Sequence, residues 1–112
     1  MERVTKIAQA LYDKKAEQID VLDIHELSSL GDYFIICSCS STTQVKACVD
    51  EVEERMTEEG LPPKHKEGYQ GGTWVLMDFG NIIVHVMQAE TREFYSLERL
   101  WEDAVRIEID LK

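Results

Sequence analysis

The most constraining feature of this chain is a predicted β-hairpin within residues 74–87. Two runs in which apolar residues recur at about every second position, 74–79 and 82–87, flank the pair Gly80-Asn81. Both residues of this pair tolerate positive φ angles, which a two-residue hairpin turn requires. The two runs are therefore expected to pair as antiparallel strands.

The N-terminal third of the chain predicts one helix and two strands. Apolar residues recur at helical spacing over about residues 2–16, which indicates an amphipathic helix. Residues 19–24 are rich in β-branched side chains, and residues 33–38 form the continuous apolar run of a strand covered on both faces. The intervening residues 25–32 contain serine and glycine, which are expected to form the connecting turn.

A second helix is predicted to begin at a capping box, Ser41-Thr42-Thr43-Gln44. In this motif the serine hydroxyl accepts a hydrogen bond from a first-turn amide, and the glutamine side chain reaches back to the amide of the cap residue. The helix is expected to end at Gly60, shortly before two prolines. Its buried stripe is predicted to consist of Val45, Cys48, Val49, Val52 and Met56.

The remaining elements are shorter. Residues 64–69 are expected to form an edge strand, and a final helix is expected to begin near Ser96. The alternating residues 106–112 could be a tail or a late strand. The order α-β-β-α-β-β-β-α predicts an α/β sandwich of two or three layers, with a mixed sheet of about five strands.

Size and charge narrow the classes of function. A chain of 112 residues is expected to form a single domain, residues 1–112. It has neither a secretory signal nor an apolar run near the roughly 20 residues that cross a bilayer, so a cytoplasmic protein without a membrane partner is expected. The net charge of −10 disfavours direct recognition of nucleic acid and suits a basic protein partner. The alternative is that the charge serves solubility alone.

The region after the hairpin carries more aromatic surface than a short helix needs for its own burial. Phe94, Tyr95 and Trp101 fall within eight positions of one another. This excess suggests a recognition surface. The alternative for each ring is an ordinary place in the core, and this alternative is stronger for Phe94 than for Tyr95 and Trp101.

Four segments together resemble one known family. Residues 32–36, 74–78, 83–86 and 92–101 closely resemble the ribosomal silencing factor family, also called Iojap-like proteins, in the family's own order. The resemblance implies a noncatalytic translational repressor. Such a protein would bind the large ribosomal subunit through its protein number fourteen and block association with the small subunit. It also implies a fold similar to that of nucleotidyltransferases.

The residues expected to contact the ribosomal protein are inferred from two observations together, the aromatic residues that follow the hairpin and the family resemblance. Aromatic side chains would anchor a basic ribosomal protein, and carboxylates would orient it. Trp74 and Leu76 share a strand face with Asp78, so this face is either a functional surface or a core face with a charge at its rim. The predicted partner-binding residues are Trp74, Leu76, Asp78, Tyr95, Leu97, Glu98 and Trp101. A homodimer in which these aromatic residues meet each other is a further alternative.

The fold implied by the resemblance raises a nucleotidyltransferase as the alternative function. Those enzymes hold two metal ions with an Asp-x-Asp pair on a strand that follows a Gly-Ser turn. Here Asp20 and Asp23 are three positions apart, so they are expected on opposite strand faces, and no Gly-Ser precedes them. Neither a catalytic residue nor a cofactor is therefore assigned.

The cysteines and histidines suggest two further alternatives, a zinc site and a nucleophile. Cys37, Cys39 and Cys48 do not have the spacing of a standard structural zinc site, and they are expected to be reduced core residues. His85 lies mid-strand, where a structural hydrogen bond is expected. A Cys39–His85 nucleophile would need an orienting group that the sequence does not supply.

Overall fold

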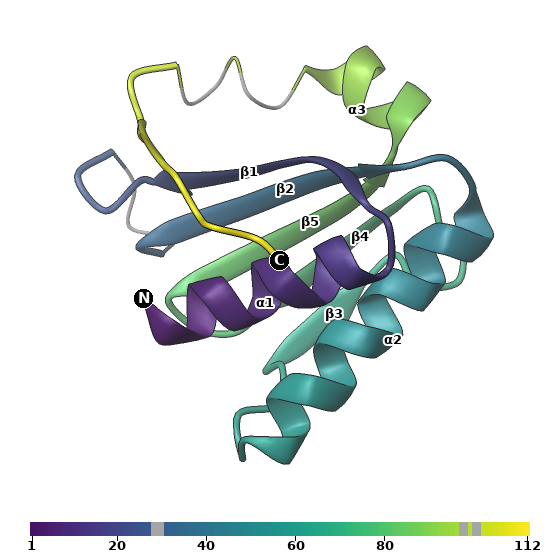
Figure 1. Cartoon of the computed structure of the whole chain (residues 1–112). Coiled ribbons are helices and arrows are strands. Elements are labelled where there is room, and N and C mark those ends of the chain that lie inside the picture. The colour runs from purple at the N-terminus through teal and green to yellow at the C-terminus, as the bar shows by residue number, and fades with distance from the viewer. Residues whose placement is uncertain (28–30, 97–98, 100–101) are drawn as a thin grey trace.

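The computed structural model describes residues 1–27, 31–96, 99 and 102–112, and shows an α/β fold built on one mixed sheet (Figure 1). The predicted fold class is confirmed, but the described residues form six strands where about five were expected. The additional strand comes from the region that was expected to be a tail or a strand. The helices are α1 (Glu2–Asp13), α2 (Thr42–Glu58) and α3 (Ala89–Tyr95), and the strands are β1 (Glu17–Asp23), β2 (Tyr33–Cys39), β3 (His65–Glu67), β4 (Trp74–Asp78), β5 (Ile82–Gln88) and β6 (Val105–Ile107).

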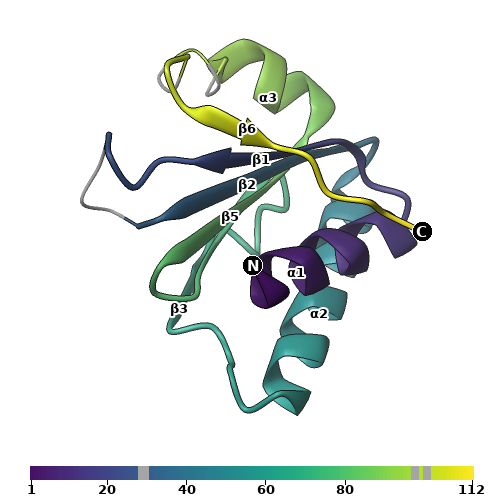
Figure 2. The same ribbon diagram turned by 60° about the vertical axis from the view of Figure 1, so that its left-hand side comes forward.

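The strands lie in the order β3-β4-β5-β2-β1-β6. Strands β2 and β5 are parallel neighbours at the centre, and every other neighbouring pair is antiparallel. Helices α1 and α2 cover one face of the sheet, and α3 lies over the other face (Figures 1 and 2). We call the first face the helix face and the second the open face. Within the described residues, no helix is long and apolar enough to cross a membrane.

The helix face holds the larger hydrophobic core. All five residues of the predicted stripe on α2 are buried, from Val45 to Met56, and they pack with α1 and the central strands. The predicted helix start is also confirmed, because the Gln44 amide donates to Ser41 Oγ at 3.0 Å. The reciprocal half of the capping box differs, since Gln44 Oε1 accepts from the Ser40 amide at 2.7 Å, one residue before the cap.

The predicted hairpin is confirmed. Strands β4 and β5 pair antiparallel, with Trp74 opposite Met87 and Asp78 opposite Ile83. The Phe79 amide donates to the Ile82 carbonyl at 2.9 Å and closes the turn. Of the two turn residues only Gly80 has a positive φ, +95°, a conformation that costs glycine little because it has no Cβ.

Two helix boundaries differ from the prediction. Helix α1 ends at Asp13, because Lys15 adopts a φ of +71° and turns the chain toward β1. The last α-helix that the structure describes, α3, begins at Ala89, before the predicted start near Ser96; a helix running on from Ser96 would fall mostly outside the described residues. Ser96 instead ends α3 in the left-handed conformation, with φ 48°, and its hydroxyl donates to the Glu93 carbonyl at 3.0 Å. Serine suits either end of a helix here because its side chain bonds nearby backbone groups.

Candidate protein-docking surface

Strand β4 places its side chains alternately on the two faces of the sheet. Val75 and Met77 are fully buried in the core beneath α1 and α2. Trp74, Leu76 and Asp78 point to the open face and are partly exposed. This alternation is what a strand requires, since successive side chains point to opposite faces. The predicted sharing of one face by these three residues is confirmed.

Aromatic rings form a continuous row from the sheet onto α3. The Trp74 and Tyr95 ring centroids are 5.1 Å apart, and those of Tyr95 and Phe94 are 5.0 Å apart. Phe94 is 80% exposed and Tyr95 56% exposed, so the outer end of the row faces solvent. These distances are typical of rings that attract one another in tilted or edge-to-face contact. We call the open-face residues Trp74, Leu76, Asp78, Phe94 and Tyr95 the docking patch.

His85 supports the inner end of this row. The Trp74 indole Nε1 donates to His85 Nδ1 at 3.0 Å, which confirms the structural hydrogen bond that was expected for His85. Because an indole N–H only donates, Nδ1 must be unprotonated and the neutral ring carries its proton on Nε2. Burial lowers the pKa of His85 to about 4, so the acceptor is present at neutral pH. Among the described residues, Nε2 has no hydrogen-bond partner.

Carboxylates border the docking patch. On the edge strand β3, Glu67 lies opposite Leu76 and contacts His65, with 2.9 Å between Nε2 and Oε1. On α3, Glu90 and Glu93 are exposed. This arrangement combines an apolar centre with an acidic rim, which is the complement of a basic protein surface with an apolar spot.

Comparison with known proteins places this surface in a family context. The family model described as "Ribosomal silencing factor during starvation" matches residues 1–112. The chain belongs to the ribosomal silencing factor family. It is 41% identical to "Ribosomal silencing factor RsfS" of Bacillus subtilis over 108 residues, 96% of this chain and 92% of that protein. It is 29% identical to "Protein Iojap, chloroplastic" of Zea mays over 103 residues, 92% of this chain and 45% of that protein.

Solved structures agree with this assignment. A crystal structure from Bacillus halodurans has a TM-score of 0.86 and 37% identity, and the match covers 96% of this chain and 98% of that one. A crystal structure from Chromobacterium violaceum has a TM-score of 0.88 and 33% identity, with 99% and 92% covered. The resemblance inferred from the sequence motifs is therefore confirmed at the level of family and fold.

Four of the contact residues predicted for this ribosomal silencing factor can be placed. Trp74, Leu76 and Tyr95 come together on the open face, where Tyr95 contacts Trp74. Asp78 shares that face, but its carboxylate also accepts from the Gly80 amide at 2.7 Å and so supports the hairpin turn. The other three, Leu97, Glu98 and Trp101, lie outside the described residues.

The sequence prediction underrated Phe94. It was expected to be in the core more readily than Tyr95, yet among the large hydrophobic residues that the structure describes as exposed it has the highest exposed fraction. Its position on α3 explains this difference, because the single buried residue of that fully described helix is Arg92. The sequence carried one usable signal, since no second apolar residue lies three or four positions from Phe94 on the N-terminal side.

The two carboxylates considered for a nucleotidyltransferase site lie on different faces of the sheet. Asp20 lies opposite Ile36 on the open face, whereas Asp23 lies opposite Tyr33, which packs against the helix-face core. The prediction that the two carboxylates point apart is confirmed. Among the described residues, no three His, Cys, Asp or Glu side chains are grouped so that they could hold a metal ion.

The thiols are also poorly placed for catalysis. Cys39 and Cys48 lie in the helix-face core with their sulfur atoms 3.7 Å apart, and all three cysteines are buried and reduced. The contact with Cys37 contributes most to raising the pKa of Cys39 to about 12, and the contact with Cys39 raises the pKa of Cys48. A nucleophilic cysteine needs the thiolate form at neutral pH. His85 faces the other side of the sheet, so it cannot pair with Cys39.

Proposed function

We propose that this protein represses translation without catalysis, by binding the large ribosomal subunit through its protein number fourteen and blocking association with the small subunit. Membership of the ribosomal silencing factor family supports the ribosome as its target. The observation that carries the proposal is the aromatic row from Trp74 to Phe94: Trp74 packs on the apolar cluster of the open face, whereas Tyr95 and Phe94 extend the row into solvent.

The chemistry of the docking patch favours a protein partner over ribosomal RNA. Exposed aromatic side chains supply much of the binding energy at protein interfaces, and opposite charges accelerate and orient the encounter. A net charge of −10 repels phosphate, whereas it attracts a basic ribosomal protein. We propose Phe94 as a contact residue in addition to the predicted set of Trp74, Leu76, Asp78, Tyr95, Leu97, Glu98 and Trp101.

The proposed mechanism is steric exclusion. A folded body seated where the small subunit docks removes the free large subunit from the association equilibrium by mass action. In this proposal residues 1–112 act as one cytoplasmic domain, and no bond is made or broken. A homodimer that uses the same aromatic row would compete with the ribosome for it, so self-association would weaken repression.

The first test is cosedimentation of the protein with purified large subunits. Tyr95→Ala is expected to reduce binding at least tenfold, because truncating an interface anchor typically costs more than about 1.4 kcal/mol. Tyr12→Ala is the matched control, since Tyr12 is 46% exposed on α1 and α1 covers the helix face. Equal loss of binding in both variants, or no sedimentation of the wild-type protein with large subunits, would contradict the proposal.

The second half of the proposal needs a subunit-joining measurement. Large subunits incubated with excess protein and then mixed with small subunits are expected to give fewer joined ribosomes on a sucrose gradient than subunits alone. Tyr95→Ala protein should restore joining at the same concentration. Binding without any effect on joining would rule out steric exclusion, and light scattering of the free protein at several concentrations would reveal a competing dimer.

A further inference from the structure

Helix α3 is attached to the sheet mainly through one polar side chain. Arg92 is 6% exposed, whereas Phe94 and Tyr95 on the same short helix are largely exposed. Within the part of the chain that the structure describes, the helix therefore has little apolar packing to fix its orientation apart from the contact between Tyr95 and Trp74. A helix of two turns does not hold its shape or position without such contacts. The orientation of the outer half of the docking patch must depend on Arg92.

Among the described residues, the guanidinium of Arg92 reaches three acceptors on two strands. Nη1 donates to the Gln18 carbonyl at 2.6 Å and to Ser38 Oγ at 3.1 Å. Nη2 donates to Asp20 Oδ2 at 2.6 Å. The planar fork of arginine suits several fixed acceptors at once, which a lysine ammonium cannot match in direction. This contact therefore fixes both the position and the rotation of α3 over β1 and β2.

Strand β1 is irregular at the point where it receives Arg92. The pairing with β2 steps from Glu17 opposite Ser38 to Asp20 opposite Ile36, so β1 carries a bulge. Within the bulge Gln18 has a φ of +49°, which is uncommon for a residue with a Cβ. Bulges redirect groups on a strand, and a strained residue persists only when its surroundings hold it in place. The carbonyl of this strained residue is the one that accepts from Arg92.

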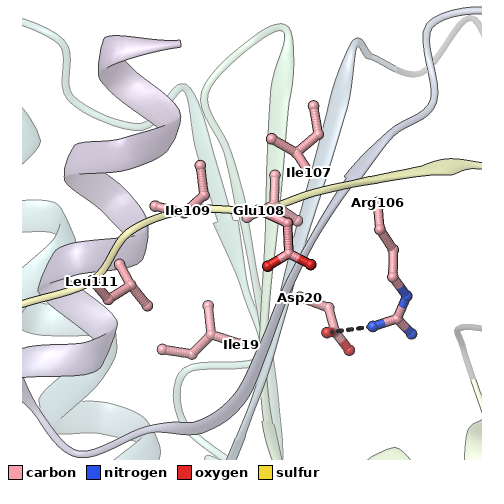
Figure 3. A pocket seen from close by; sticks show the side chains of 8 residues that line it. Ile19, Asp20, Arg106, Ile107, Glu108, Ile109 and Leu111 are labelled. Carbon is pink, nitrogen blue, oxygen red and sulfur yellow. Dashed lines mark hydrogen bonds and ion pairs between the residues drawn. The ribbon is translucent and has the colours of Figure 1, made fainter.

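The carboxylate of Asp20 also holds a second element. Its Oδ1 accepts from Arg106 Nη1 at 2.8 Å, and Arg106 belongs to β6 (Figure 3). Helix α3 ends at Tyr95 and the edge strand β6 begins at Val105, so one carboxylate contacts the elements on both sides of the connecting segment. Figure 3 shows Asp20 and Arg106 together, while Ile109 and Leu111 lie on the side of α1.

We propose that Asp20 and Arg92 are positioning residues for docking, which hold α3 at the height and rotation that bring Phe94 and Tyr95 into one surface with Trp74. The inference rests on the proposed function, in which that surface binds the large subunit. A surface that is already ordered before the encounter binds more tightly, because less conformational entropy is lost when the complex forms. Neither residue needs to touch the partner.

The test compares Arg92→Lys with Arg55→Lys. Arg55 is the matched control, because it bridges α1 and α2 through Asp13 at 2.8 Å and Glu51 at 2.6 Å, and both helices cover the helix face. Arg92→Lys is expected to speed amide exchange of α3 at least tenfold in the free protein and to weaken cosedimentation with large subunits about tenfold. Arg55→Lys should change neither quantity, although it too loses a guanidinium that meets more than one acceptor.

Three further variants cover the case in which Arg92→Lys folds poorly. Asp20→Asn keeps the size of the side chain and is expected to speed exchange in both α3 and β6. Arg106→Ala removes only the second, exposed arm of the cluster, so it should speed exchange in β6 more than in α3. Asp20→Glu, which keeps a carboxylate, is expected to recover part of the docking affinity that Asp20→Asn loses.

Amide exchange of α3 tests the positioning role, and cosedimentation of the wild-type protein tests the proposed function, so the two can fail separately. Unchanged exchange of α3 in Arg92→Lys and Asp20→Asn would overturn the positioning role, whatever the ribosome result. Faster exchange with unchanged docking would also overturn it. If the wild-type protein fails to sediment with large subunits, the proposed function falls, while the exchange of α3 still decides whether Asp20 and Arg92 hold that helix.

Discussion

The two faces of the sheet are built by different means. The helix face is filled with fully buried aliphatic side chains and cysteines that α1 and α2 cover. The open face has a small apolar cluster, and it also carries all three of the described polar side chains that are buried, Ser38, His85 and Arg92. On the helix face, apolar packing against the two long helices is enough to hold the layers together. Where only α3 is available, hydrogen bonds to buried polar groups define the surface instead.

This difference supports the proposal that the open face is the docking surface. Its rings are held at their inner edge by specific polar contacts, such as Trp74 to His85, and remain uncovered at their outer edge. A face that is ordered but uncovered can bury apolar area against a partner without first being rearranged. We expect the helix face to supply most of the folding stability and the open face to supply the docking contacts.

The largest effect is expected for two neighbouring residues of β4. Met77→Ala removes a fully buried side chain from the helix face and should lower the free energy of unfolding by about 2–5 kcal/mol. Leu76→Ala, on the open face, should cost about 1 kcal/mol because the side chain is only partly buried. Urea denaturation measures both values. Equal losses for the two variants would show that the open face is ordinary core.

An intermediate effect is expected when the pH is lowered. In the unfolded chain His85 takes up a proton near its ordinary pKa of 6.5, whereas in the folded protein burial lowers its pKa to about 4. Acid therefore favours the unfolded state, and the free energy of unfolding should fall between pH 6.5 and 4 by up to about 3 kcal/mol, at about 1.4 kcal/mol per pKa unit. Denaturation curves across this range measure the loss.

The control for the pH effect is His85→Asn, which keeps an acceptor for Trp74 but does not titrate. Its stability should fall less steeply with acid than that of the wild type. Other groups titrate in both proteins and cancel in the difference, including His25, whose pKa the Asp23 carboxylate raises. The raised pKa of His25 adds stability at low pH that is lost as the pH rises, the opposite sign to His85. Superimposable curves for the two proteins would contradict the assignment.

The smallest effect on stability is expected at the most exposed ring. Phe94→Ser should change the free energy of unfolding by no more than about 0.5 kcal/mol, because the side chain is 80% exposed. The same variant should weaken docking to large subunits severalfold, since it removes apolar contact area from the docking patch. Thermal melting and cosedimentation of one preparation would measure both. Unchanged docking would remove Phe94 from the proposed contact set.

Much of the fold could be predicted because local patterns determine it. Apolar residues at every second position, with Gly80 at the turn between them, specified the hairpin. Apolar residues at helical spacing specified the buried stripe of α2. The position of α3 could not be predicted in the same way. Serine is common at both ends of helices, so the sequence did not show that Ser96 ends α3. An arginine among exposed residues is also expected to face solvent. Only the bulge in β1, which presents acceptors to Arg92, shows why this side chain is buried.

The sequence by itself determined the family, the hairpin and the sharing of one strand face by Trp74, Leu76 and Asp78. Each of these depends on residues that are close along the chain or on a motif read as a whole. Only the tertiary structure decided that Tyr95 meets Trp74, that Phe94 faces solvent, and that Asp20 ties α3 to β6. Such contacts join residues far apart in sequence, and their geometry depends on how the sheet, its bulge and the short helix pack together.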